Sequence, residues 1–112
     1  MATSPPQKRS NTQTKPKESD EPEIAILGLV RGRVQGVGFR FEARSVAKSL
    51  NLRGWVMNLP DGGVETWAEG PQSAVHRYRQ WLEKGPPGAK VDHIDASERA
   101  PRGDFSGFTI EF

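Results

Sequence analysis

Residues 24–50 read IAILGLVRGRVQGVGFRFEARSVAKSL. The run from Ile24 to Val30 is short, apolar and rich in β-branched side chains, which predicts a central β-strand. From Arg40 onward the apolar residues recur at intervals of three and four, which predicts an amphipathic helix that Asn51 closes. The apolar positions of this helix are Phe39, Ala43, Val46, Ala47 and Leu50. The first unit of the fold is therefore a strand that leads through a glycine-containing connection into a helix.

Two strands are predicted after this helix, at about 52–58 and 63–69. Between them, Pro60-Asp61-Gly62-Gly63 supplies the residues of a tight turn, so the two strands should form an antiparallel hairpin. Asp61 could act as a general base, but a carboxylate in such a sequence is ordinary turn chemistry. Thr66 lies in the second strand at a position where a larger aliphatic side chain is expected to pack better.

A second helix and two more extended segments complete the pattern. Pro71 and Ser73 begin this helix, and the sequence Gly85-Pro86-Pro87-Gly88 ends it. Its apolar positions are Ala74, Val75, Tyr78, Trp81 and Leu82. Extended runs follow at 90–98 and 105–112.

The predicted order is βαββαβ with a final β segment or strand extension. This order indicates an α+β fold, a ferredoxin-like two-layer sandwich in which two helices cover one face of an antiparallel sheet. The split βαβ connections would put the first and third strands side by side at the centre, with the second and fourth outside. The loop at 34–40 and residue 58 can then meet at one rim of the sheet.

The first 23 residues differ sharply in composition from the rest. Residues 1–23 carry Met1 and Ala2 as their only apolar side chains, too few to offset the entropy of ordering the chain. We therefore expect a disordered polar tail over 1–23 and a single domain over 24–112. Four positive and four negative charges cancel in the tail, so the net charge of +2 belongs to the domain.

Several classes of protein are excluded by composition. The chain has no cysteine, which rules out disulfides, cysteine-ligated metals and the thiolate nucleophile of cysteine-based phosphatases. No run approaches the roughly 20 apolar residues of a membrane span, and no secretory signal pattern is present. His76 and His93 have no second ligand at metal-binding spacing. We expect a cytoplasmic protein without a metal, a nucleic-acid partner or a membrane partner.

The connection Val34-Gln35-Gly36-Val37-Gly38-Phe39-Arg40 carries the strongest chemical signal. Gly36 and Gly38 allow positive φ and a tight curl around a small group. A loop that enters a helix points unpaired N–H groups, and the positive end of the helix dipole, in one direction. Such a loop binds anions, and Arg40 adds a planar set of donors suited to phosphate. Taken alone, the segment could equally be a glycine-rich turn that precedes a helix.

A second segment favours the anion-binding loop over the simple turn. It reads Gly54-Trp55-Val56-Met57-Asn58 and is followed by Asp61-Gly62. Together with Gly32-Arg33 and the connection 34–40, it closely resembles the acylphosphatases. The resemblance covers roughly residues 24–112 and includes Ala68-Glu69-Gly70, Lys84-Gly85-Pro86-Pro87 and Phe105-Ser106-Gly107-Phe108. It implies the same ferredoxin-like fold and the hydrolysis of acyl phosphates to a carboxylate and inorganic phosphate.

The resemblance also implies roles for individual residues. Arg40 and Asn58 would be catalytic, with Arg40 holding the phosphate and Asn58 positioning the attacking water. The backbone amides of the loop would complete a phosphate cradle formed by Gln35, Gly36, Val37, Gly38, Phe39 and Arg40. No metal or cofactor is implied. We expect a monomer that binds an acyl phosphate as substrate and inorganic phosphate as product and inhibitor.

Two other interpretations remain open on the sequence. One is a non-catalytic anion- or RNA-binding ferredoxin-like module, although the aromatic and basic pattern of RNA readers is missing. The other is an accessory domain of a larger carbamoyl-transfer enzyme. Trp55 could form a wall of the site, but a large aromatic residue in a strand is more commonly a packing residue. No residue outside the cradle identifies the acyl group of the substrate.

Overall fold

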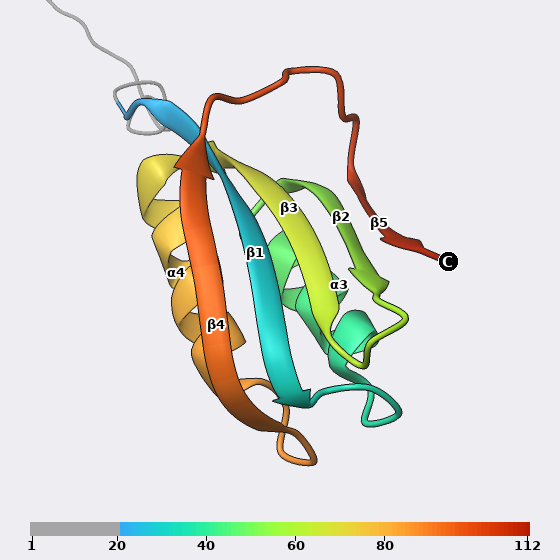
Figure 1. The fold of residues 1–112 in the computed structure, drawn as a ribbon. Coiled ribbons are helices and arrows are strands. Elements are labelled where there is room, and N and C mark those ends of the chain that lie inside the picture. The colour runs from blue at the N-terminus through green and yellow to red at the C-terminus, as the bar shows by residue number, and fades with distance from the viewer. Residues whose placement is uncertain (1–20) are drawn as a thin grey trace, which may run out of the picture.

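The computed structural model describes residues 21–112, which form two layers, a five-stranded sheet and two helices packed on one of its faces (Figure 1). The elements are β1 (Glu23–Arg33), α3 (Phe39–Ser49), β2 (Arg53–Asn58), β3 (Val64–Pro71), α4 (Gln72–Lys84), β4 (Lys90–Arg99) and β5 (Phe108–Glu111). Each predicted helix and strand is present, and the predicted ferredoxin-like α+β fold is confirmed.

The strand order in the sheet is β4-β1-β3-β2-β5. The first and third strands lie side by side at the centre and pair antiparallel, with Ile26 opposite Ala68 and Val30 opposite Val64. This confirms the arrangement expected from split βαβ connections. The final β segment is a separate strand, β5, which pairs with β2 in the parallel direction at one edge. The sheet is therefore mixed, and antiparallel except at that edge.

The hydrophobic core lies between the sheet and the helices. Both helices place an apolar face against the sheet, and the strands contribute alternate side chains. Among the most buried side chains are Phe39, Ala43, Val56, Val64, Val75, Tyr78 and Leu82. Burying one large apolar side chain stabilises the fold by about 1.5–3 kcal/mol, so this layer holds α3 and α4 in place.

Asn51 ends α3 as predicted. It adopts a left-handed conformation with φ of 59°. The amide of Asn51 donates to the carbonyl of Lys48, and that of Leu52 donates to the carbonyl of Ala47, at 3.0 and 2.9 Å. These bonds form a Schellman motif that satisfies the last carbonyls of the helix. The chain then enters β2, so this end of α3 sets where β2 begins.

Thr66 corrects one expectation from the sequence. Its side chain is fully buried, and its hydroxyl lies 2.7 Å from the carbonyl of Trp55 and 2.8 Å from the hydroxyl of Tyr78. Burial raises the pKa of Tyr78 despite its bond to Thr66, so the phenol stays protonated and remains a hydrogen-bond donor. An aliphatic residue at position 66 would leave that phenol without this partner, which is why threonine fits here.

The packed domain includes Glu21–Glu23, which the composition had assigned to the tail. The carboxylate of Glu21 accepts from the amide and hydroxyl of Ser73, at 2.9 and 3.0 Å. The carbonyl of Pro22 accepts from the amide of Gln72 at 3.0 Å. The rest of the predicted tail, residues 1–20, lies outside the described residues. Within the described chain, neither helix is long and apolar enough to cross a membrane.

Candidate active site

The connection between β1 and α3 has the backbone geometry that its glycines suggest. Gly36 and Gly38 have φ of 75° and 78°, a region that disfavours side chains. Gly38 is the N-cap of α3, and its carbonyl accepts the first helical bond from Glu42 at 3.1 Å. A Cβ atom built on either glycine would meet nothing within 4 Å. The two glycines are therefore required by backbone conformation, and they leave the space beside the loop open.

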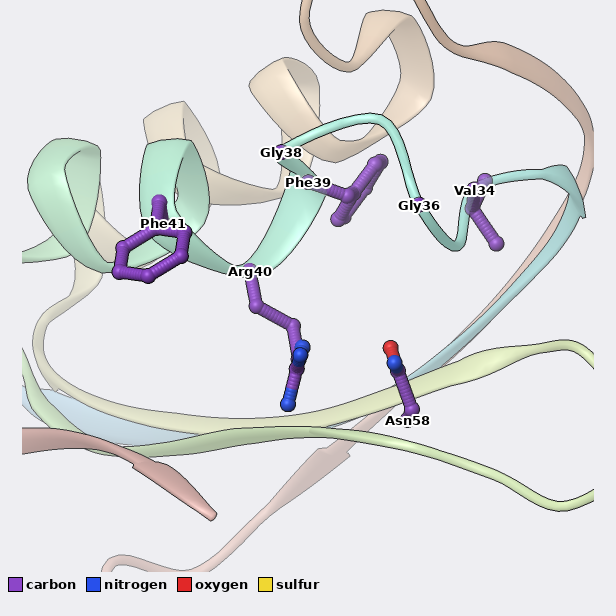
Figure 2. Close-up of a pocket in the computed structure, with 7 residues that line it drawn as sticks. All are labelled: Val34, Gly36, Gly38, Phe39, Arg40, Phe41 and Asn58. Atoms are coloured by element: carbon purple, nitrogen blue, oxygen red, sulfur yellow. The ribbon is translucent and has the colours of Figure 1, made fainter. Parts of the chain in front are cut away.

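A pocket lies between this loop, the first turn of α3 and the end of β2 (Figure 2). It is lined by Val34, Gly36, Gly38, Phe39, Arg40, Phe41 and Asn58. Its volume is about 180 Å³, several times the roughly 30 Å³ that one water molecule occupies in the liquid. The pocket therefore has room for a small anion together with a water molecule.

Arg40 and Asn58 come from different layers and point into the same space (Figure 2). Arg40 lies in the first turn of α3, which Phe39 anchors by packing its ring 5.3 Å from that of Trp81. Asn58 is the last residue of β2, on the same side of the strand as the fully buried Val56. The packing of helix on sheet therefore brings the two polar side chains together, a meeting that the sequence alone did not establish.

The side-chain oxygen of Asn58 is buried without a partner. Among residues 21–112 it is the buried side-chain polar atom for which no hydrogen bond is found. Leaving a buried acceptor unpaired costs about 1–3 kcal/mol, and such groups in native structures call for an explanation. A water molecule or a ligand atom in the pocket would supply the missing donor.

Gln35 makes contacts through its side chain, whereas the predicted cradle role of this residue involves its backbone amide. Its side-chain amide donates to the carbonyls of Leu59 and Gly63, both at 2.8 Å, so it ties the loop to the turn between β2 and β3. Neither Gln35 nor Val37 is among the residues that line the pocket. The other four predicted cradle residues, Gly36, Gly38, Phe39 and Arg40, do line it.

Asp61 belongs to the turn and lies outside the pocket lining. Its carboxylate accepts from the amide of Gly63 at 3.1 Å and pairs with Arg31 at 2.6 Å. The hydrogen bond from Gly63, followed by that from Arg31, holds the pKa of Asp61 below its ordinary value. A carboxylate with these partners is a weak base, which supports the structural interpretation.

Three residues beside the site were given no role of their own in the sequence analysis. Val34 and Phe41 line the pocket, and the ring of Phe112 lies 5.0 Å from the guanidinium carbon of Arg40. Phe41 had one available signal, because it falls outside the apolar face of its helix. Phe112 had none, since only the path of β5 brings it near Arg40.

The remaining candidates lie elsewhere. Trp55 is not among the pocket-lining residues and pairs in register with Trp67 of β3. His93 lies 3.7 Å from Asp95, its neighbour on β4. Within residues 21–112, no group of three histidine, cysteine or acidic side chains is arranged to hold a metal ion.

Comparison with known proteins adds a consistent set of similarities. The family model described as Acylphosphatase matches residues 27–110. The acylphosphatase of Acaryochloris marina is 45% identical over 87 residues, which cover 78% of this chain and 92% of the relative. The crystal structure of acylphosphatase from Bacillus subtilis has a TM-score of 0.77 and 37% identity, covering 80% of this chain and 99% of that one.

A larger protein also contains a similar domain. The structure of full-length HypF in the phosphate- and nucleotide-bound form has a TM-score of 0.71 and 26% identity. The match covers 81% of this chain but only 12% of HypF. Domains of this shape therefore occur both in proteins of similar length and as a part of a much longer one.

Proposed function

The chain belongs to the acylphosphatase family, and from this premise we propose that it hydrolyses acyl phosphates with Arg40 and the loop amides binding the phosphate and Asn58 positioning the water. The water oxygen forms a bond to phosphorus as the bond from phosphorus to the acyl oxygen breaks. The carboxylate leaves with that oxygen, and the proton of the water passes to a phosphate oxygen. The products are a carboxylate and dihydrogen phosphate, so atoms and charge balance.

The proposed phosphate cradle combines backbone and side-chain donors. The first helical bond of α3 runs from Glu42 to Gly38, so the amides of Phe39, Arg40 and Phe41 precede the intrahelical ladder. They lie at the positive end of the helix dipole. An acyl phosphate carries close to two negative charges near neutral pH, and its desolvation is costly unless donors replace its water. The guanidinium of Arg40 supplies the opposite charge.

The proposed role of Asn58 follows from its unpaired oxygen. A carboxamide oxygen accepts a hydrogen bond without removing the proton, so it can orient a water molecule and leave it neutral. No strong base is then needed, because the carboxylate is a good leaving group and phosphate can take the proton. Catalysis is mainly positioning and electrostatic stabilisation, as in phosphoryl transfer generally. The buried, unpartnered Asn58 Oδ1 facing Arg40 is the observation that carries the proposal.

The test is release of inorganic phosphate from acetyl and benzoyl phosphate by the purified chain. We expect turnover that excess chelator does not change, and competitive inhibition by inorganic phosphate. Asp61→Asn is the control for the competing general-base role, and it should retain turnover because Asp61 lies outside the pocket lining. A large loss in Asp61→Asn, or the absence of phosphate release, would overturn the mechanism.

The accessory-domain interpretation is favoured by one observation, the similarity to a small part of HypF. It differs from the first proposal in a measurable way. An accessory domain specialised for delivery within a larger protein would bind phosphate but release little of it from free acyl phosphates. We propose the hydrolytic role, because similarity to the Bacillus subtilis acylphosphatase covers nearly all of that chain. We also propose that the protein acts as a monomer in the cytoplasm.

A further inference from the structure

Two aromatic side chains are exposed beside Arg40. Among residues 21–112, the large hydrophobic side chains that are exposed are Phe41, at 67%, and Phe112, at 100%. Phe41 lines the pocket, and Phe112 stacks on the guanidinium of Arg40. A single exposed apolar side chain needs no explanation. Two at the same arginine indicate that this rim of the pocket contacts something apolar.

Phe41 contributes little to the core. The buried residues of α3 are Phe39, Ala43 and Ala47, which lie on one face of the helix. A helix turns by about 100° per residue, so Phe41 projects away from the direction of Phe39. Packing within the domain therefore does not account for a phenylalanine at position 41, whereas its place on the pocket does.

The in-line geometry of phosphoryl transfer places the acyl group on the side of Phe41. In phosphoryl transfer the attacking and leaving oxygens are roughly in line across phosphorus. If Asn58 holds the water, the acyl oxygen departs on the opposite side. Figure 2 shows Phe41 and Asn58 on opposite sides of Arg40, with both residues lining the same pocket. The acyl group thus emerges where the pocket presents an aromatic ring.

We propose that Phe41 is a specificity-determining residue that contacts the acyl group, and that the enzyme favours acyl phosphates with aromatic or extended apolar acyl groups. This inference rests on the hydrolytic function and phosphate cradle proposed above. None of the pocket-lining residues is acidic, and Arg40 is the lining residue with a positive charge. A small polar acyl group would therefore meet a ring on that side rather than a hydrogen-bonding partner.

The experiment compares kcat/KM for benzoyl and acetyl phosphate in three proteins. Phe41→Ala removes the ring, and Lys48→Ala is the control, since Lys48 is exposed in the last turn of the same helix. We expect the original chain to prefer benzoyl phosphate. Phe41→Ala should lower kcat/KM for benzoyl phosphate by roughly three- to tenfold, the range of aromatic pair contacts. Acetyl phosphate, which presents one methyl group, should lose less than about twofold.

Each other outcome has a distinct meaning. If Phe41→Ala lowers kcat/KM equally for both substrates, Phe41 supports the helix or the phosphate cradle and the specificity role is wrong. Unchanged kcat/KM values for both substrates would also overturn the specificity role. Phe41→Leu should give an intermediate ratio, because it retains apolar contact but loses the ring. The inhibition constant of inorganic phosphate should be the same in the original chain and in all the variants. If the original chain hydrolyses neither substrate, the proposed function itself fails.

Discussion

Arg40 and Asn58 act on different parts of one proposed reaction, although they line the same pocket. Arg40 carries a positive charge at the start of a helix, where the backbone adds its own positive potential. Asn58 is neutral and offers an oxygen that has no other partner among the described residues. The first residue should therefore control binding of the anion, and the second should control the position of the nucleophile.

We predict that Arg40→Ala and Asn58→Ala fail in different ways. Arg40→Ala should weaken binding of inorganic phosphate and also abolish turnover, because the counter-charge is lost. Asn58→Ala should bind phosphate nearly as before while turnover falls by roughly 10²–10³, the usual cost of one preorganised polar group. Phosphate titration by calorimetry, beside steady-state kinetics, separates the two effects. Circular dichroism should show both variants folded.

Full turnover in a folded Asn58→Ala protein would remove Asn58 from the mechanism. Equal loss of phosphate binding in the two variants would mean that Asn58 belongs to the cradle itself. The two side chains come from different elements, so neither substitution should disturb the backbone that carries the other.

The loop and the β2–β3 turn behave as one structural unit through Gln35. The hydrogen bonds from its side-chain amide to the carbonyls of Leu59 and Gly63 join the loop of the proposed phosphate cradle to the residues that follow Asn58. The turn is also closed internally, since the amide of Leu59 donates to the carbonyl of Gly63 at 2.8 Å. Gln35 is thus placed to keep the distance between the proposed phosphate cradle and the proposed water position constant.

Gln35→Leu should therefore uncouple the two parts of the site. Each lost hydrogen bond is worth about 0.5–1.5 kcal/mol of folding stability, so urea unfolding should show a loss of about 1–3 kcal/mol. Turnover should fall more than phosphate binding, because a shift of about 1 Å in a reacting group can cost 10²-fold. Gln80→Leu, the same change at an exposed position on α4, serves as the control. If Gln35→Leu has a normal kcat and reduced stability, the hydrogen bonds of Gln35 have a purely structural role.

At the scale of the whole molecule, a buried carboxylate fastens the segment between β4 and β5. The connection passes around one end of the sheet before β5 pairs with β2 (Figure 1). The fully buried Glu69 accepts hydrogen bonds from the amides of Arg102 and Gly103, both at 2.9 Å, and from the indole of Trp67 at 2.8 Å. This anchor fixes the start of the segment that later carries Phe112 to Arg40.

Glu69 should make stability depend on pH in the acidic range. Burial alone raises its pKa, but hydrogen bonds from Trp67, Arg102 and Gly103 and the charge of Arg53 outweigh burial and lower the pKa below its usual 4.5. A carboxyl group whose pKa is lowered in the folded state stabilises the fold at pH values above its ordinary pKa. This stability is lost as the pH falls through the pKa of the folded state. Chemical unfolding between neutral pH and about pH 3 should show this decline.

Glu69→Gln should flatten that decline and lower stability at neutral pH by about 2 kcal/mol, since bonds to a charged acceptor are lost. Glu83→Gln is the matched control, because Glu83 pairs with Arg79 on the surface at 2.9 Å. Exposed pairs of this kind contribute little. If both variants show the same pH dependence as the original chain, Glu69 is not the source of the acid sensitivity.

The sequence by itself determined the local features of this protein. The helical and strand periods, the closure of α3 at Asn51 and the glycine-dependent loop all depend on residues close together in the chain. The resemblance of two motifs to the acylphosphatases also singled out Arg40 and Asn58, whose proposed roles stay predictions. Even the central place of β1 and β3 followed from the order of elements, because split βαβ connections leave few arrangements.

Only the tertiary structure decided the contacts between distant segments. The tie from Gln35 to the turn, the parallel pairing of β5 with β2, and the approach of Phe112 to Arg40 each join residues far apart in the chain. The hydroxyl of Thr66 meets that of Tyr78 only because α4 packs over β3. Such pairings depend on where the whole backbone runs, and local periodicity carries no information about which side chain a neighbouring element will present.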